Sequence, residues 1–438
     1  MFIVLKLLRL LLAIAIVALA LLYRMPFWAN WRSDSFLGIV IVGLALLVSE
    51  TFAYRRNYTI TRTILSSAIL LVTSLSLCLT LGIETKFYFV KQAVLNTPTS
   101  RLESLGKHFV VGYRDLGEVK QLVEKKAVSG VFLTSRNIKG RTKEAIAQEI
   151  KTLQTIRQKQ GLSPLWVAVD QEGGIVSRLS PPLTLLPPLA EVVENTKNIA
   201  ERETEVIKYA TIHGQELAAL GVNLNFAPVV DLNYGIINPQ DKYSRIYQRA
   251  IALDEKTVSQ VALWYCQTLE EFQVSCTLKH FPGLGSIAVD THLNNAELTT
   301  TVEKLTQQDW LPFQEVASKS SAFTMLGHVK LTAVDSENPV SFSEKVVKGI
   351  IREKWQNQGI LITDDFSMNP VSLSPDGVEG ATLKAINGGV DLILISFDQD
   401  LFYPAILGLL KAQKVGELEK SMLKISNQRL TKNQPNKF

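Results

Sequence analysis

The sequence predicts a (β/α)8 barrel of the TIM type, preceded by an all-α transmembrane segment of two or three helices. Apolar residues concentrate in the first ninety of the 438 residues, and the rest alternates strand-like runs with stretches of helical periodicity. The chain is 47% hydrophobic and only 20% charged, which is more hydrophobic than an ordinary cytosolic enzyme. We therefore expect a membrane segment over residues 1–87 and a globular part over residues 88–438.

Three apolar runs make up the membrane segment, and each is close to the roughly 20 residues that a helix needs to cross a bilayer. We expect spans at about 8–28, 36–53 and 63–84. The first run could instead be a cleaved signal peptide, with Lys6 and Arg9 as its charged start and Ala18-Leu19-Ala20 as a poor cleavage site. We find no intramembrane charge pair in these runs, and the sequence specifies no protein partner.

Basic residues predict the orientation of the membrane segment. Arg55, Arg56 and Arg62 crowd the loop between the second and third runs, and Lys6 and Arg9 precede the first. Placing both groups in the cytoplasm puts the globular part on the other side of the cell (inner) membrane. The net charge of +5 is too small for a nucleic-acid-binding surface, so we expect no nucleic-acid partner.

The globular part contains eight apolar, β-branched runs, each followed by a stretch with helical spacing. The expected strands are 108–113, 130–134, 165–170, 222–226, 275–280, 322–328, 359–363 and 390–396. The clearest expected helices are 143–160, 201–220, 255–272, 302–319 and 343–358. Apolar strands that alternate with helices form a parallel sheet, and eight units match a barrel. A doubly wound open sheet is the alternative. Cys266 and Cys276 lie in expected core elements, so the sequence requires no disulfide.

Polar side chains collect where the expected strands end, which is the face of a (β/α)8 barrel that carries the chemistry. These residues are Asp170, Lys279, His280, His328, Asp364 and Ser396. Several ionisable groups at the ends of different strands predict an active site rather than surface decoration.

The run Asp170-Gln171-Glu172-Gly173-Gly174 places a carboxylate beside a backbone that a ligand can approach. Such a carboxylate accepts hydrogen bonds from neighbouring sugar hydroxyls, and Arg178 could add donors; the alternative is an Asx turn with a glycine bend. Lys279 and His280 are adjacent at a buried strand end, which is costly unless polar groups satisfy them.

Two further motifs carry candidate catalytic groups. Asp290 and His292 lie on a loop that follows Pro282-Gly283-Leu284-Gly285, and an aspartate two residues from a histidine can hold the ring in one tautomer. The alternatives are a solvated loop or half of a metal site, and a metal is disfavoured because no further ligand has suitable spacing. Asp364 ends an apolar strand and can act as a nucleophile, whereas Asp365 or Ser367 is expected to cap the next helix.

Together these motifs resemble glycoside hydrolase family 3, in particular its single-domain β-N-acetylglucosaminidase branch, over roughly residues 100–400. The resemblance implies that Asp364 is the nucleophile and that His292, with Asp290 as its partner, is the general acid/base. It implies sugar contacts from Asp170, Arg178, Arg249, Lys279 and His280, and no cofactor or metal. The chain departs from the family pattern at Ala250-Ile251, Leu284, Thr291 and Asn294-Asn295-Ala296.

We therefore expect a retaining exo-glycosidase that removes terminal β-linked N-acetylglucosamine from amino-sugar glycans such as peptidoglycan fragments. The chain ends soon after the eighth unit, which leaves no room for a second domain to supply an acid/base carboxylate, so a loop-borne histidine takes this role. The alternatives are a β-glucosidase or glycoside phosphorylase on the same fold, and a non-catalytic glycan-binding membrane protein.

Overall fold

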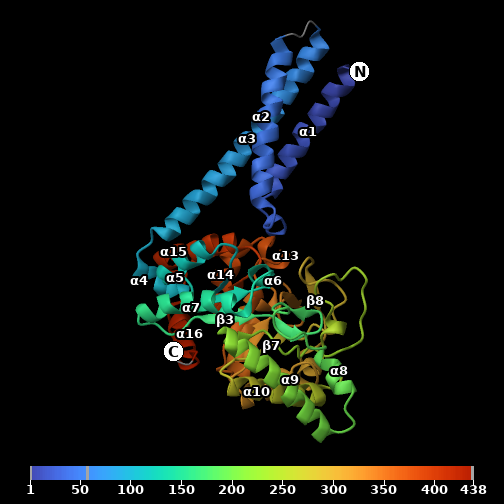
Figure 1. Ribbon diagram of the computed structural model, residues 1–438, viewed down its shortest axis with the longest axis vertical. Coiled ribbons are helices and arrows are strands. Elements are labelled where there is room, and N and C mark those ends of the chain that lie inside the picture. Colours follow the sequence, from blue (N-terminus) through green and yellow to red (C-terminus); the bar gives the residue numbers. More distant parts are fainter. Residues whose placement is uncertain (1, 56–58, 436–438) are drawn as a thin grey trace. The chain divides into compact units, whose positions relative to one another are not determined.

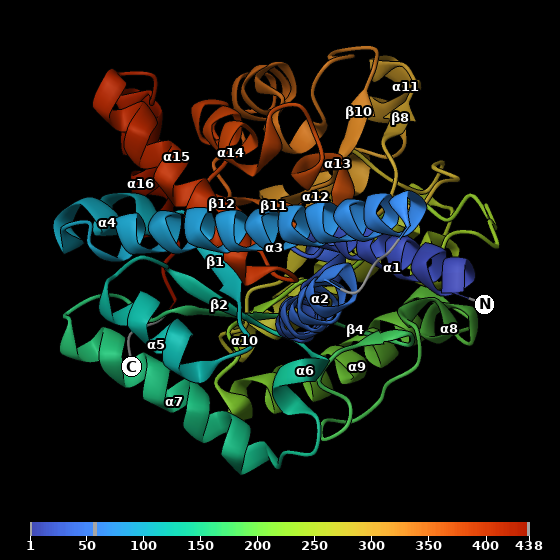
Figure 2. The ribbon, with the colours of Figure 1, turned by 90° about the horizontal axis from the view of Figure 1, so that it is seen from above.

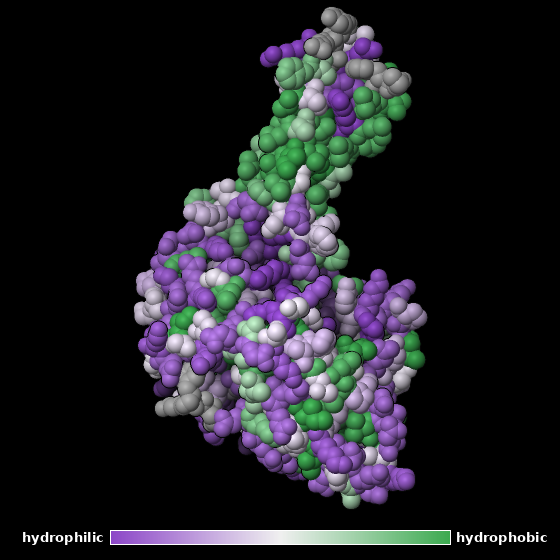
Figure 3. All heavy atoms as spheres, in the orientation of Figure 1, coloured by the Kyte–Doolittle hydropathy of each residue, from purple (hydrophilic) through white to green (hydrophobic). Residues whose placement is uncertain are grey.

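The computed structural model describes residues 2–55 and 59–435, and the chain divides into two compact units, Met1–Asn96 and Thr97–Phe438. In its described part, the first unit is a bundle of three long helices (Figure 1), namely α1 (Phe2–Leu22), α2 (Arg32–Arg55) and α3 (Ile60–Leu95). All three are long and apolar enough to cross a membrane, by length and composition. Apolar side chains cover much of the outer surface of the bundle (Figure 3). Helix α3 continues past residue 87, where we expected the globular part to begin.

The three helices pack on one another through small and apolar side chains. The buried residues of this core are Ala13, Ile16, Ala20 and Tyr23 of α1, Ile39 and Leu46 of α2, and Ile69 of α3. Small residues at such positions let helix backbones approach closely in an apolar surrounding. Helix α1 is therefore an integral member of the bundle.

The bundle also contains buried and partly buried ion pairs, and the expectation that it has none is wrong. Lys6 pairs with Glu50 and donates to the Ser66 hydroxyl at 2.5 Å, and Arg9 donates to Glu50 Oε1 at 2.7 Å. A second pair joins Arg24 to Glu84 at 2.5 Å. Charged groups in apolar surroundings pair with one another. These partners are more than forty residues apart in the sequence, so no local pattern reveals them.

The second unit is a nearly closed parallel barrel, as predicted. Its strands are β1 (Phe109–Gly112), β2 (Gly130–Leu133), β3 (Trp166–Val169), β6 (Leu224–Asn225), β7 (Thr277–Phe281), β9 (Phe323–Leu326), β11 (Leu361–Asp365) and β12 (Leu392–Ile395). They pair in the order β6-β3-β2-β1-β12-β11-β9-β7. Bridges from Leu224 to Ser275 and from Val229 to Lys279 link β6 to β7. These bridges exclude the open-sheet alternative, because they join the two outer strands of the ladder.

Helices surround the strands (Figure 2). They are α4 (Thr99–Gly106), α5 (Leu116–Glu124), α6 (Ser135–Ile138), α7 (Lys143–Lys159), α8 (Leu189–Glu194), α9 (Ile199–Leu220), α10 (Glu255–Glu271), α11 (Val302–Gln307), α12 (Leu311–Lys319), α13 (Asn369–Ser372), α14 (Gly377–Asn387), α15 (Phe402–Val415) and α16 (Lys420–Lys432). Two small sheets pair β4 (Gln171–Gly173) with β5 (Val176–Ser177), and β8 (Ala296–Leu298) with β10 (Val329–Leu331). The expected helix 302–319 is two helices, and the expected helix 343–358 is a π-helix over Lys345–Lys354.

Large side chains fill the interior of the barrel. Phe132 stacks on Phe226 with ring centroids 5.6 Å apart, and Trp166 meets Phe323 edge-on at 5.0 Å. All four rings are at most 5% exposed. The barrel is therefore a packed core rather than a pore, and polar chemistry is confined to its ends.

A disulfide joins Cys266 of α10 to Cys276, which directly precedes β7, with a Cα–Cα distance of 5.3 Å. Both cysteines are buried. The pairing differs from our expectation that no disulfide is required. It arises because the chain turns back directly from α10 into β7, so residues ten apart come to lie side by side.

A buried carboxylate ties together the N-terminal end of the barrel. Asp391, which directly precedes β12, accepts from Arg352 at 2.5 Å, from Arg429 of α16 at 2.8 Å and from the Ser426 hydroxyl at 2.7 Å. Asp391 is completely buried, and both arginines are at most 7% exposed. This end of the barrel is therefore structural, and α16 closes it.

Candidate active site

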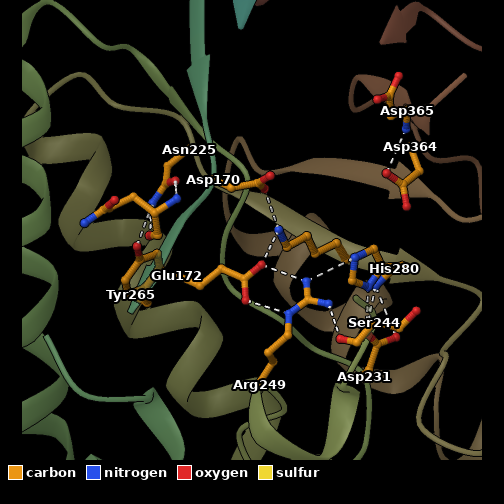
Figure 4. Close-up of polar contacts among 12 residues, drawn as sticks. Asp170, Glu172, Asn225, Asp231, Ser244, Arg249, Tyr265, His280, Asp364 and Asp365 are labelled. Carbon is orange, nitrogen blue, oxygen red and sulfur yellow. Dashed lines mark hydrogen bonds and ion pairs between the residues drawn. The ribbon is translucent and has the colours of Figure 1, made fainter. Parts of the chain in front are cut away.

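Glu172 is the centre of a buried ionic network at the C-terminal end of β3 (Figure 4). Arg249 donates to both of its carboxylate oxygens, at 2.7 and 2.9 Å, and Lys279 pairs with Oε1 at 2.5 Å. Lys279 also donates to Asp170 Oδ1 at 2.8 Å. Asp170 is 24% exposed while the other three side chains are at most 6% exposed. Asp170 is therefore the network's most accessible group.

The charges of this network are mutually stabilising. Burial by itself raises the pKa of Glu172, but the charges and hydrogen bonds of Arg249 and Lys279 lower it to about 2. Glu172 is therefore ionised at neutral pH and neutralises two buried cations. We assigned Glu172 no role from the sequence; its position two residues after Asp170, on a two-glycine turn, was the available signal.

The turn that carries Asp170 and Glu172 is fixed by hydrogen bonds to Asn225 and by the close packing of Gly173. Asn225 accepts from the Gln171 amide at 3.0 Å and donates to the Gln171 carbonyl at 2.8 Å. Gly173 has φ of +94°, and a Cβ there would lie 1.8 Å from the Tyr209 hydroxyl. Only glycine fits this position, so the turn is fixed by sterics as well as by hydrogen bonds.

His280 is oriented by Asp231. The ring Nδ1 lies 2.8 Å from Asp231 Oδ2, and the His280 amide donates to both Asp231 oxygens at 3.1 Å. On the other side of the ring, Nε2 lies 3.4 Å from the Arg249 guanidinium. Since arginine can only donate, Nε2 accepts from Arg249, and the Nδ1–H group of His280 donates a hydrogen bond to Asp231. We assigned Asp231 no role from the sequence, because its role depends on a partner 49 residues away.

Asp364 lies at the end of β11, and its carboxylate points toward His280 in Figure 4. Its Oδ1 accepts from the Asp365 amide at 2.7 Å. Burial by itself raises the pKa of Asp364, but the nearby His280, His328 and His292 hold it below its ordinary value. Asp364 is therefore a carboxylate at neutral pH, which is the form that attacks carbon.

Asp365 stabilises the strand end rather than capping a helix, and our expectation of a cap by Asp365 or Ser367 is wrong. Asp365 accepts from the Ser396 hydroxyl at 2.6 Å and from the Phe397 amide at 2.9 Å, and so binds the end of β12. Helix α13 begins after Met368 with no side-chain cap. His328 contacts the Asp365 carbonyl at 3.0 Å and so supports the same strand end.

The loop after β7 carries Asp290 and His292. His292 Nδ1 lies 3.1 Å from Asp290 Oδ1, which also accepts from the His292 amide at 3.0 Å. Burial alone raises the pKa of Asp290, but the hydrogen bonds and charge of His292 lower it to about 2. Asp290 is 2% exposed and the His292 side chain 39%. The pair therefore presents an accessible imidazole on a buried carboxylate.

Asn369 ties this loop to the segment that follows Asp364. Its amide donates to the His292 carbonyl at 3.0 Å, and its side chain donates to the Leu293 carbonyl at 3.2 Å. His292 is also among the charges that lower the pKa of Asp364. His292 and Asp364 thus lie at the same end of the barrel.

Arg178 is the exception among the expected site residues. Its amide donates to the Asp170 carbonyl at 3.0 Å. Its side chain is exposed and makes no hydrogen bond or ion pair with the residues that the structure describes. Over residues 2–55 and 59–435, no group of three or more His, Cys, Asp or Glu side chains has the arrangement of a metal site.

Residues 99–432 match the N-terminal domain of glycosyl hydrolase family 3. The chain belongs to this family. A β-hexosaminidase of Idiomarina loihiensis is 29% identical over 290 residues, which cover 66% of this chain and 83% of that one. The family 3 resemblance inferred from the motifs is therefore confirmed, and the chain is a glycoside hydrolase.

Solved structures of family 3 members share the fold. A family 3 β-N-acetylglucosaminidase from a Paenibacillus species superposes with a TM-score of 0.68 at 27% identity, covering 76% of this chain but only 61% of that one. A family 3 glycosyl hydrolase of Mycobacterium smegmatis superposes with a TM-score of 0.67 at 26% identity, covering 79% of this chain and 99% of that one.

Asp309 is a buried carboxyl in the family 3 barrel, and we expect Asp309→Asn to stabilise the protein at neutral pH. Burial raises the pKa of Asp309 to about 6, although Tyr234 donates to its carboxylate at 3.1 Å. Stability that is present below the unfolded pKa of about 4 is lost as pH rises through 6, because ionising the buried carboxyl is unfavourable. The variant should gain up to about 3 kcal/mol at pH 7.5. Thermal unfolding at pH 7.5 and pH 4.5 checks this, and an equal gain at both values would contradict it.

Proposed function

We propose that this family 3 enzyme is a retaining exo-β-N-acetylglucosaminidase with Asp364 as nucleophile and His292, assisted by Asp290, as general acid/base. The observation that carries the proposal is the tether through Asn369, which holds the His292 loop against the segment after Asp364. The printed names of the relatives, β-hexosaminidase and β-N-acetylglucosaminidase, support the sugar.

The ionic network supplies the means to bind a terminal sugar. The Asp170 carboxylate accepts hydrogen bonds from sugar hydroxyls. Lys279 donates to Asp170, and Arg249 and His280 lie next to each other in the same network. Because Glu172 already holds Lys279 and Arg249 by ion pairs, these two side chains lose little conformational freedom when the sugar binds. We also propose that Arg178 contacts the sugar, because its side chain is exposed and makes no hydrogen bond or ion pair with the described residues.

The reaction is a double displacement. Asp364 attacks the anomeric carbon as the bond to the leaving oxygen breaks, and the proton on His292 passes to that oxygen. His292, now neutral, takes a proton from water, whose oxygen attacks the same carbon and displaces Asp364. The sugar is released with retained configuration, and both groups return to their starting state.

A panel of aryl glycosides tests this proposal. We expect the aryl β-N-acetylglucosaminide to be hydrolysed in the absence of phosphate, with kcat/KM at least about 100-fold above that of the aryl β-glucoside, because a site built to bind a polar substituent rejects the analogue that lacks it. A requirement for phosphate would indicate a phosphorylase, preference for the glucoside a β-glucosidase, and binding without turnover a glycan-binding protein. Each of these results contradicts the proposal.

We further propose that residues 1–96 anchor the enzyme in the cell (inner) membrane and that residues 97–438 act outside the cytoplasm. The basic residues Arg55, at the end of α2, and Arg62, in the first turn of α3, support this orientation. The Cys266–Cys276 disulfide supports it independently, since disulfides persist in oxidising compartments. The burial of α1 in the bundle favours a retained span over a cleaved signal. Amino-sugar glycans on that side, such as peptidoglycan fragments, are the proposed substrates.

Thiol labelling checks the compartment. In protein extracted from native membranes and denatured without reductant, a maleimide is expected to label Cys78 alone, because Cys266 and Cys276 are joined. After reduction all three cysteines of the chain are expected to react. Labelling of Cys266 before reduction, counted by intact mass, would contradict the proposed extracytoplasmic location.

A further inference from the structure

Ser244 lies against the proposed acid/base pair although it is far from it in the sequence. Its hydroxyl is 3.2 Å from Asp290 Oδ1, 3.0 Å from Thr291 Oγ1 and 3.3 Å from His292 Nδ1, and it accepts from the Thr291 amide at 3.1 Å. Ser244 is 3% exposed. One buried hydroxyl thus contacts three consecutive residues, 290–292, of the loop after β7.

The backbone around Ser244 completes the cradle for Asp290. The amides of Lys242 and Tyr243 both donate to Asp290 Oδ2 at 3.1 Å. Asp290 Oδ1 is left for the Ser244 hydroxyl and for His292. Each carboxylate oxygen therefore has its own partners, and the carboxylate cannot rotate without losing several of them.

The carbonyl of Ser244 connects this cradle to the sugar-binding network. Arg249 Nη1 donates to the Ser244 carbonyl at 2.7 Å, and the same guanidinium donates to the Glu172 carboxylate (Figure 4). Ser244 is thus hydrogen-bonded to the acid/base pair through its side chain and to the sugar-binding network through its backbone. A single residue therefore joins Arg249 to Asp290.

We propose, building on the function above, that Ser244 is a positioning residue that fixes the His292 imidazole over the sugar bound by Arg249 and Asp170. Held at Nδ1 by both Asp290 and Ser244, the ring presents Nε2 to the leaving oxygen. A hydroxyl suits this place because it accepts from the Thr291 amide and still donates to Asp290. Without it, Asp290 alone leaves the ring free to tilt, and small misplacements of a proton donor are costly.

The test compares Ser244→Ala with wild type, both full-length in detergent, on two β-N-acetylglucosaminides that differ only in the leaving group. An alkyl leaving group needs a proton from His292, whereas a dinitrophenyl leaving group does not. We expect kcat/KM to fall about 10- to 100-fold for the alkyl glycoside and less than about 3-fold for the dinitrophenyl glycoside. Azide should restore kcat for the dinitrophenyl glycoside, because it attacks the glycosyl-enzyme without a general base.

Two further variants complete the comparison. Ser244→Thr keeps the hydroxyl and is expected to retain the leaving-group dependence of wild type. Ser372→Ala removes a hydroxyl that donates, among the described residues, to the carbonyls of Ser367 and Met368, and is expected to match wild type on both glycosides. An equal fall of Ser244→Ala on both glycosides without azide rescue, or no fall on either, overturns the role of Ser244 alone. A wild-type enzyme that cleaves neither glycoside overturns the proposed function as well.

Discussion

Replacing Asp364 by alanine is expected to lower kcat for an aryl β-N-acetylglucosaminide by at least about 10⁴-fold. The side chain is the proposed nucleophile at the end of β11, whose pKa three histidines lower, and an alanine in its place cannot form the proposed covalent intermediate. A slow fluorinated N-acetylglucosaminyl donor should leave one sugar on wild-type protein and none on Asp364→Ala. Intact-mass measurement distinguishes these results.

Asp376→Ala is the matched control for this variant. Asp376 is another aspartate in the chain segment after β11, but it lies on the surface and pairs with Lys384. We expect its activity to remain within about 2-fold of wild type, since exposed ion pairs contribute little. If Asp364→Ala kept a tenth or more of the wild-type rate, Asp364 would not be the nucleophile.

The largest expected effect on stability is that of Asp391→Ala. This change leaves Arg352 and Arg429 buried without their counter-charge, and removing one partner of such a cluster costs about 3–5 kcal/mol. For a domain of this size the loss corresponds to a fall in Tm of roughly 4–7 °C. Thermal unfolding followed by near-ultraviolet circular dichroism measures it.

Ser426→Ala is the graded control for Asp391. It removes one neutral hydrogen-bond donor to the same carboxylate and is expected to cost only about 1 kcal/mol. Because the cluster lies at the end of the barrel opposite Asp364, both variants should keep wild-type kcat at temperatures where they are folded. A Tm for Asp391→Ala within a degree of wild type would show that the arginines find other partners.

Local sequence patterns were sufficient for the strands because each is a short apolar run that the barrel buries along its whole length, as in Trp166–Val169. They were insufficient where a tertiary contact interrupts a helix. The expected helix over 302–319 breaks before Leu311, where Trp310 is fully buried and its Nε1 donates to the Pro282 carbonyl at 3.1 Å. Such a contact leaves no trace in the local periodicity.

The site residues also differ in whether local sequence patterns or tertiary contacts reveal them. Asp170, Lys279, His280 and Asp364 could be identified because they end strands, and the ends of parallel barrel strands meet by construction. Glu172 and Ser244 gained their roles only from partners far along the chain, 77 residues away for Arg249 and 48 for His292. Arg178 is the opposite case: it matches a motif position, but this match does not determine where its long side chain points.

The ion pairs in the first unit determine where the chain can be shortened. Deleting α1 alone would remove Lys6 and Arg9 and so leave Glu50, which is completely buried in α2, without the two cations that pair with it. A truncated version made for crystallisation or assay should therefore start after Asn96, and any version that keeps α2 must also keep α1, which supplies the cations that pair with Glu50.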